Sequence, residues 1–392
     1  MKKILIASPF FHPEPISTGK YNTFLAKELL AKGNLVTVIC SYPFYPEWQP
    51  KFTSENIPGT LTFRGGLENV YPKNAVARRI ILEVWFCWHF FKNRKKNRES
   101  EIIVAIMPPV FFTIFLKHFF KTSKKIAIAH DFVGVMATSY KSFFRKFVAV
   151  IMKKLESMLL RNFDKVICLS KSMKNMAIND YGLERIRCEV HYPFVTIETG
   201  KDWPPTCEGI FSADQIHVVY SGALGEKQQP KVIYQLFIDI CDRKKNVLCH
   251  FFSRGPIFNK LKSENKYSKI CFHDLVPENL LSKLYACSDV QVVLQAPGTS
   301  TGSFPSKVTN LIASGVPILA ICDEDSELAK VILQNGAGKT ETCSDHNKII
   351  GSLEALLNEI ENESRLKRKL SVEKFVLDNF NINKLVESIT NA

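Results

Sequence analysis

The sequence predicts an α/β protein with two doubly wound parallel-sheet domains. Short segments that are apolar throughout alternate with helical stretches along most of the chain. Strands that are apolar on both faces are typical of a parallel sheet covered by helices on both sides. The alternation lapses once, in a segment rich in Pro, Gly and Thr, and then starts again. Because 392 residues also exceed one ordinary hydrophobic core, we expect two domains.

The first domain is expected over residues 1–195. A helix is predicted at Thr18–Lys32, after a Pro-rich loop whose one glycine, Gly19, lies at the helix start. A second helical region is predicted at Ala75–Arg98. Apolar runs predict strands at residues 3–8, 35–40, 102–107, 125–130 and 165–170.

Residues 196–213 are predicted to link the domains, and the second domain is expected over residues 214–375. Its strands are predicted at residues 215–221, 247–253, 269–273, 289–295 and 316–322, with helices near 231–241, after 256 and at 277–287. A C-terminal helix within 376–392 can pack back on the first domain. Two such domains are expected to face each other across a cleft, with the chemistry there.

The segment Gln295–Leu319 is the strongest local motif. A polar loop, QAPGTSTGSF, follows an apolar strand, and Pro305, Ser306 and Lys307 open a short helix that carries Asn310 one turn on. Backbone N–H groups at a helix start favour an anion, and Lys307 adds a positive charge there. Asn310 can bond neutral hydroxyls. The segment therefore predicts a nucleotide-sugar site, or else an ordinary strand–loop–helix unit in which Ser306 only starts the helix.

The positive charge lies in the first half. Residues 1–195 contain 30 Lys and Arg against 14 Asp and Glu, and the rest of the chain contains 22 against 24. Such a balance predicts an acidic partner, and basic residues alternate with aromatic ones at 80–98, 111–125 and 140–154. We favour docking at a membrane surface. Two other interpretations stay open, a domain core that contains Trp85 and Trp88, and nucleic acid, although no nucleic-acid motif is present.

No segment is predicted to span a bilayer. The most apolar candidate, from Ile102, is short and is interrupted by Pro108 and Pro109. The N-terminal MKKILIAS is better explained as a buried strand than as a signal peptide. The 11 cysteines show no CxxC spacing, and we expect them to be reduced, small buried hydrophobic residues, in keeping with a cytoplasmic protein.

Several segments together resemble the retaining glycosyltransferases of family 4. They are Gly19 in the first loop, SYPFYPEW, IAHDF, VICLSKSM, VVYSGALGEKQ and FPSKVTNLIASGVPIL. The chain is most similar to the branch that builds colanic acid and O-antigen or capsule repeats. The resemblance implies the GT-B fold, two Rossmann-like domains, and transfer of a sugar from a nucleoside diphosphate with retention of configuration.

The resemblance also implies roles for particular residues. Lys227 matches the lysine that contacts the donor diphosphate, and His130 matches a histidine near the transferred sugar; Asp131 is the other catalytic candidate. An arginine usual in the family is missing near Ala223, so Arg254 or Lys307 is expected to share its charge. Of the family's paired glutamates, the first falls on Gly302 and the second on Asn310. The donor-binding residues we predict are Gly19, Gly222, Lys227, Arg254, Leu275, Ser306, Lys307 and Asn310.

A competing interpretation concerns Asp323-Glu324-Asp325. A DxD motif holds manganese in the other glycosyltransferase fold, but here Asp325 or Ser326 is expected to cap a helix. We therefore predict no metal and no cofactor, with the nucleoside-diphosphate-sugar as donor substrate.

The predicted function is transfer of a hexose-type sugar to an undecaprenyl-diphosphate-linked or other glycan acceptor. The enzyme is expected to act in the cytoplasm, at the inner face of the cell membrane, without nucleic acid. Two alternatives remain. One is a nucleotide-sugar epimerase or hydrolase of the same fold, and the other is a non-catalytic scaffold at the membrane, because the Gly302 carboxylate and the arginine are absent.

Overall fold

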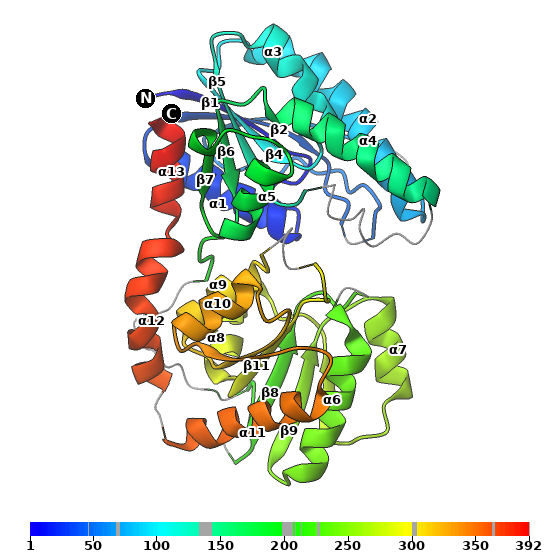
Figure 1. Ribbon diagram of the computed structural model, residues 1–392. Coiled ribbons are helices and arrows are strands. Elements are labelled where there is room, and N and C mark those ends of the chain that lie inside the picture. Colours follow the sequence, from blue (N-terminus) through cyan, green and yellow to red (C-terminus); the bar gives the residue numbers. More distant parts are fainter. Residues whose placement is uncertain are drawn as a thin grey trace. The chain divides into compact units, whose positions relative to one another are not determined.

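The computed structural model describes residues 1–45, 47–67, 71–132, 143–197, 207, 209–212, 214–225, 228–299, 304–362 and 365–391. The chain forms two compact units, each with its own sheet (Figure 1). Unit 1 consists of Met1–Pro193 and Asn381–Ala392, and unit 2 of Phe194–Phe380. The predicted boundary at residue 375 falls inside a helix, α12 (Arg365–Asn379), that belongs wholly to unit 2.

The sheet of unit 1 is parallel and has the order β3-β2-β1-β4-β5-β6-β7. Its strands are β1 (Lys3–Ala7), β2 (Leu35–Ser41), β3 (Thr60–Gly65), β4 (Ile102–Met107), β5 (Lys124–Ala129), β6 (Lys165–Cys168) and β7 (Cys188–Val190). All six residues of β4 are buried, as its uninterrupted apolar run predicts for a strand covered on both faces.

Helices cover both faces of this sheet. They are α1 (Ser17–Ala31), α2 (Ala75–Asn93), α3 (Leu116–Phe119), α4 (Phe143–Leu160), α5 (Lys171–Asn179) and α13 (Ile382–Thr390), with 3₁₀ turns at Arg94–Asn97, Phe111–Phe115 and Arg185–Arg187. The larger core packs α2, α4 and α5 against side chains such as Leu5 and Ile103. The C-terminal helix α13, red in Figure 1, packs against α1 and β4.

Polar contacts also hold α13 to unit 1. The Lys2 ammonium donates to the carbonyl of Thr390. Lys165 donates to the Ser388 carbonyl at 2.9 Å and forms an ion pair with Glu189 at 2.8 Å. The last turns of α13 are therefore tied to Lys2, just before β1, to β6 through Lys165, and to β7 through a bond from the Ser388 hydroxyl to Glu189.

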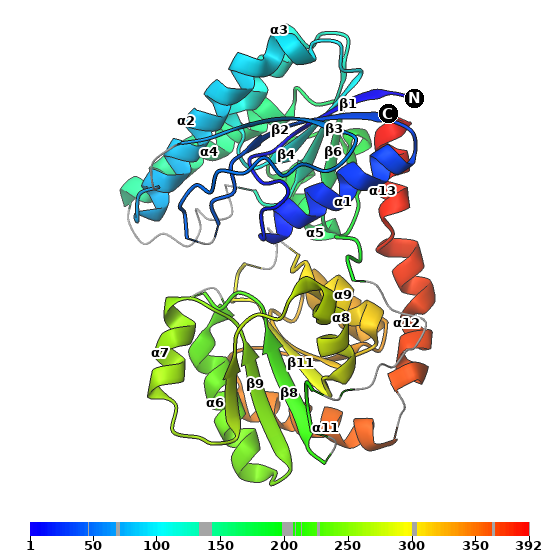
Figure 2. The ribbon, with the colours of Figure 1, turned by 180° about the vertical axis from the view of Figure 1, so that it is seen from behind.

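Unit 2 also has a parallel sheet, in the order β10-β9-β8-β11-β12-β13 (Figure 2). Its strands are β8 (Ile216–Ser221), β9 (Val247–Phe252), β10 (Ile270–His273), β11 (Val290–Leu294), β12 (Ile318–Ile321) and β13 (Gly338–Glu341). Its helices are α6 (Pro230–Arg243), α7 (Pro256–Glu264), α8 (Glu278–Cys287), α9 (Lys307–Ser314), α10 (Glu327–Gln334), α11 (His346–Asn362) and α12. The prediction of two doubly wound parallel-sheet domains is confirmed.

The prediction for the cysteines is wrong at one pair. Cys207 and Cys287 form a disulfide with Cα atoms 5.5 Å apart, whereas the other nine cysteines are free. The pair is 80 residues apart in sequence, and the fold brings Cys207 to the end of α8. Among the described residues, no helix has the length and apolar character needed to cross a bilayer.

The packing of α13 gives a prediction for stability. Ile389 is fully buried in unit 1, so Ile389→Ala leaves a cavity and is expected to lower the free energy of unfolding by about 2–4 kcal/mol. Tryptophan fluorescence during urea unfolding is the measurement, since three of the four tryptophans, Trp48, Trp85 and Trp88, belong to unit 1. The exposed neighbour Glu387 is the control, and Glu387→Ala is expected to change the free energy of unfolding by less than about 0.5 kcal/mol. Equal effects of the two changes would contradict the docking of α13.

Candidate functional site

The strand order of unit 2 indicates where a ligand binds. In the order β10-β9-β8-β11-β12-β13, the chain leaves the adjacent strands β8 and β11 in opposite directions along the sheet. In open α/β sheets this switch point, at the carboxyl ends of the strands, is the usual ligand site. The two segments that the sequence singles out, GALGEKQ after β8 and QAPGTSTGSFPSK after β11, follow the two strands that flank it.

Two glycines shape the loops at this edge of the sheet. Gly222 directly follows β8 with φ +117°, and Gly255 precedes α7 with φ +109°. A side chain rarely adopts such backbone angles, and a Cβ at either position would have no neighbour within 4 Å. The Gly222 N–H donates to the carbonyl of Phe252 at 2.9 Å, which joins the loops after β8 and β9. The backbone here is thus open to the close approach of a ligand.

Lys307 lies at the switch point but points its ammonium into the protein. Nζ donates to the carbonyl of Ser221 at 3.1 Å and to that of Val292 at 3.4 Å, and it lies 4.4 Å from the centre of the Tyr220 ring. Burial lowers the pKa of this lysine to about 7. Lys307 therefore joins β8 to β11 through hydrogen bonds to carbonyl groups of both strands. Any contact of this lysine with a ligand would come in addition to these bonds.

Asn310 holds a segment of its own unit. Its Oδ1 accepts from the backbone N–H of Thr196 at 2.8 Å, and its Nδ2 donates to Thr196 Oγ1 at 2.9 Å. Both ends of the amide are engaged, and Asn310 is buried. The predicted bond to a ribose hydroxyl would have to share these groups.

Three more predicted donor residues, Arg254, Leu275 and Ser306, lie at the same edge of the sheet. Arg254 follows β9 and is exposed, and Leu275 follows β10 and is 39% exposed. Ser306 precedes α9 in helical conformation, and its side chain does not cap the helix. Lys227 and Gly302 lie outside the described residues.

In unit 1 the corresponding switch point lies between β1 and β4. His130 directly follows β5, and its backbone N–H donates to the carbonyl of Met107, the last residue of β4, at 2.9 Å. The His130 ring meets that of Tyr21 edge-on, with centroids 6.4 Å apart. Burial lowers the pKa of His130 to about 4, so its imidazole is neutral at physiological pH. Asp131, next to it, is exposed.

Gly19 has a packing role that the sequence does not reveal. A Cβ there would lie 2.9 Å from the carbonyl oxygen of Glu14, so only glycine fits. Glu14 itself is buried, and its carboxylate accepts from the N–H groups of Phe44 and Tyr45 at 2.8 and 3.0 Å. Burial raises the pKa of Glu14 to about 7 despite these bonds. Glu14 is the acidic residue of the PEP segment in the first loop. A carboxylate between two prolines is the sequence signal that could have indicated its hydrogen bonds to the SYPFYPEW segment.

The acidic triplet supports the structure of unit 2. Asp323 accepts from the N–H of Gly298 at 2.9 Å, which holds the loop after β11. Ser326 caps α10 by accepting from the Ala329 N–H at 3.0 Å, as predicted.

The outer face of α2 is apolar. Val76, Ile80, Val84 and Trp88 recur every fourth residue and are 57, 58, 60 and 64% exposed. The row continues into an exposed basic group, Lys92, Lys95, Lys96 and Arg98. Trp85 instead packs against the core and stacks on His89, so a core role is correct for Trp85 and wrong for Trp88.

Comparison with known proteins identifies the first half of the chain. Residues 18–199 match the family described as Glycosyltransferase Family 4. This stretch is similar to the domain of glycosyltransferase family 4. The chain is 23% identical over 361 residues to WcaI of Escherichia coli strain K12, which is named as a glycosyl transferase of colanic acid biosynthesis; the match covers 84% of this chain and 85% of WcaI.

Solved structures agree over the whole length. Sucrose-phosphate synthase from Thermosynechococcus elongatus has a TM-score of 0.76 at 15% identity, with 100% of this chain and 98% of that one covered. WaaG, a glycosyltransferase involved in lipopolysaccharide biosynthesis, has a TM-score of 0.70 at 12% identity, with coverage of 99% and 100%. HepE of Anabaena, in complex with UDP and glucose, has a TM-score of 0.67 at 12% identity, with coverage of 100% and 99%. The fold is that of the GT-B glycosyltransferases.

The lowered pKa of Lys307 predicts how stability depends on pH. The pKa is about 7 in the folded protein and near the ordinary 10.5 in the unfolded chain. Between these values the unfolded chain binds more protons, so this lysine makes the free energy of unfolding rise as the pH rises. Wild type minus Lys307→Met should therefore give a difference in unfolding free energy that increases from pH 7 to about pH 10.

The matched control is Lys330→Met, since Lys330 is an exposed lysine on α10. For this pair the difference should be flat over the same range, because the exposed Lys330 side chain is surrounded by solvent in both the folded and the unfolded protein. A flat or falling difference for Lys307→Met would contradict the burial of the Lys307 side chain at the switch point.

Proposed function

We propose that this protein transfers a sugar from a nucleoside diphosphate to a hydroxyl of a lipid-linked or glycan acceptor, with retention of configuration. The observation that carries the proposal is the switch point of unit 2, where the loops after β8 and β11 hold the nucleotide-sugar motifs. The similarity of the first half to family 4 and the UDP complex of HepE support it. A hexose is the sugar class we propose.

The chemistry needs charge stabilisation on the leaving group. The bond between the anomeric carbon and the β-phosphate oxygen breaks, a bond to the acceptor oxygen forms on the same face, and the acceptor proton passes to the departing phosphate. Lys227, Arg254 and the positive dipole ends of α6, α7 and α9 stabilise the growing charge, and such stabilisation usually contributes most of the rate enhancement in this kind of catalysis. Because these cations are side chains, we propose that transfer uses no metal ion and no cofactor.

In unit 1 the proposed catalytic residues are His130 and Asp131. A neutral imidazole donates one hydrogen bond and accepts another, so His130 can bind a sugar hydroxyl without adding charge. The exposed carboxylate of Asp131 can accept from the acceptor hydroxyl.

We further propose that unit 1 docks on the cytoplasmic face of the inner membrane, where an undecaprenyl-diphosphate-linked acceptor resides. The apolar row on α2 ends in a tryptophan and is followed by exposed lysines and arginine. Apolar insertion beside basic residues suits an anionic lipid surface. The names of WcaI and WaaG support a role in surface polysaccharide synthesis.

Lys227→Ala tests the donor site. An enzyme of this kind should lose transfer activity on the order of 10²–10³-fold in kcat, because one fixed cation facing the leaving group is removed. The exposed lysine four residues on, Lys231, is the matched control, and Lys231→Ala should keep the kcat of the wild type.

Thermal-shift assays test nucleotide binding directly. Wild-type protein with UDP, GDP or dTDP, each at about 100 times the Kd of that nucleotide, should gain about 2.7 kcal/mol of stability. Each shift is taken against a nucleotide-free sample with the same chelator or added metal.

The alternatives give different outcomes in the same assays. Turnover of the donor without any acceptor would identify an epimerase or hydrolase. No nucleotide-induced shift and no turnover, with membrane binding intact, would identify a scaffold. A nucleotide shift that requires added divalent metal would contradict the metal-free donor site.

The membrane proposal predicts a loss of lipid binding when α2 is made acidic. The double change Val84→Glu and Trp88→Glu should abolish cosedimentation with vesicles that contain anionic phospholipid, because it removes exposed apolar area and adds negative charge. The control is Leu61→Glu with Leu333→Glu, two leucines that are 59 and 56% exposed and belong to other elements, β3 and α10. Equal loss in both double variants would contradict docking through α2.

A further inference from the structure

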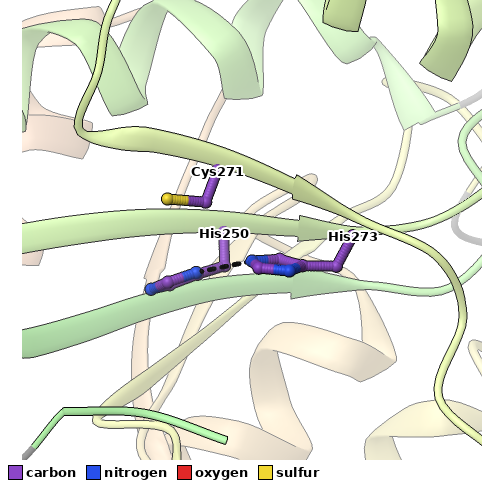
Figure 3. Close-up of side chains that lie close together, drawn as sticks. All are labelled: His250, Cys271 and His273. Carbon is purple, nitrogen blue, oxygen red and sulfur yellow. Dashed lines mark hydrogen bonds between the residues drawn. The ribbon is translucent and has the colours of Figure 1, made fainter.

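A cluster of metal-ligand side chains lies on the edge of the unit 2 sheet. His250 is on β9, and Cys271 and His273 are on the edge strand β10 (Figure 3). Cys271 pairs with His250 across the strands, and His273 is two residues on, so all three side chains project from the same face. One ligand atom of each lies within 4.8 Å of the others. None of these residues belongs to the proposed donor site.

A chain of hydrogen bonds determines which nitrogens carry protons. His217 Nε2 lies 2.9 Å from the carbonyl of Ser212, which can only accept, so this nitrogen donates. His217 Nδ1 must then accept from His250 Nε2 at 3.0 Å, when both rings are neutral. The lone pair of His250 Nδ1 consequently faces His273 Nε2, 3.0 Å away. This places an oriented nitrogen ligand in the cluster.

Aromatic rings pack against the imidazoles of the cluster. Phe211 stacks on His217 with centroids 4.3 Å apart and lies 4.7 Å from the His250 ring. Phe252 stacks on His273 at 4.4 Å. The aromatic rings restrain both imidazoles.

We propose that His250, Cys271 and His273 bind a zinc-like divalent ion, with a water molecule as the fourth ligand. Two imidazole nitrogens and a thiolate form a ligand set that suits zinc in tetrahedral geometry. Nitrogens bound to one such ion at 2.0–2.1 Å are about 3.3 Å apart, close to the separation of His250 Nδ1 and His273 Nε2. His250 is buried, whereas Cys271 and His273 are half-buried, so the ion enters from the sheet edge.

Binding releases one proton and transfers no electrons. The Cys271 thiol loses its proton to solvent as its sulfur bonds the ion. The His273 proton moves from Nε2 to Nδ1 through water, so the ring stays neutral and Nε2 becomes a ligand. His217 keeps its bond to His250 Nε2 and orients the ring, the usual role of a hydrogen-bonded neighbour of a metal-binding histidine.

The ion would fasten the edge strand to β9 just before two loops of the proposed donor site. His273 is two residues from Leu275, and its carbonyl accepts from the N–H of Ser253 at 3.1 Å, next to Arg254. The ion thus holds in place the loops that carry Arg254 and Leu275. This consequence rests on the proposed function, whereas the ion site itself does not.

Cobalt(II) is the probe for the ion site, titrated into the full, untagged chain after treatment with chelator. We expect one equivalent to give the near-ultraviolet thiolate-to-cobalt absorption, and zinc to displace it. Cys271→Ser should lose the thiolate-to-cobalt absorption, and His273→Ala should no longer bind one equivalent of cobalt(II) tightly. His217→Ala should keep the absorption but bind about 10–100-fold more weakly. The control is Cys343→Ser, another half-buried free cysteine, which should titrate like the wild type.

Two results would overturn the proposal. One is wild-type protein that shows no thiolate absorption and no rise in unfolding midpoint with zinc. The other is an absorption that persists in Cys271→Ser. Because Cys271→Ser changes one atom, circular dichroism can show that this variant is folded even where His273→Ala is not. The spectrum needs no donor, so its outcome is independent of whether nucleotide sugars bind.

Discussion

The divergence of two adjacent parallel strands, β8 and β11, is the constraint on which the site in unit 2 depends. Their connections run along opposite faces of the sheet, so the loops at their carboxyl ends separate and the N-terminus of each following helix lies at that edge. Such an edge binds anions but is weakly held by the sheet itself. Lys307 compensates by joining the Ser221 and Val292 carbonyls beneath the loops, and Asn310 fixes Thr196 beside the same helix. The short segment 306–310 therefore contains both kinds of residue. Lys307 and Asn310 hold the protein structure around the site, and Ser306 is a proposed donor-binding residue.

Most of the fold could be predicted because its central strands are buried on both faces. The run IIVAIM is apolar without interruption, and the strand VQVVL within DVQVVLQ has one polar residue, Gln291; each corresponds to a central strand. The strands that the sequence does not predict are β3, β7 and β13. All three are edge strands: β3 and β13 have mostly half-buried, mixed sequences, TLTFRG and GKTE, and β7 has only three residues. Edge strands need only one apolar face, so their composition resembles that of a loop.

The sequence predicted which loops carry the candidate site, but it did not predict the directions in which their side chains point. The motifs lie at the ends of β8 and β11 as expected, yet no pattern in the sequence indicates that Lys307 faces inward. Asn310 meets Thr196, 114 residues earlier, and Cys207 meets Cys287, 80 residues later. The histidine cluster was visible only as His217, His250 and His273 inside strand-like runs, where a polar residue signals a buried partner. Contacts between distant segments need the fold before they can be inferred.

The inward direction of Lys307 does not remove it from the donor chemistry that we propose. A neutral amine has two N–H donors, which matches its two carbonyl partners, and a pKa of about 7 makes that form abundant. A diphosphate over the switch point would raise this pKa, because a nearby negative charge favours the ammonium form. The ligand would then bind with uptake of a proton, and the third N–H would become available. Arg254, always charged, cannot respond in this way. Without a ligand, a neutral Lys307 avoids the free-energy cost of a buried, unpaired charge. This supports different roles for the two residues: Arg254 is an exposed cation, and Lys307 becomes charged when the diphosphate binds.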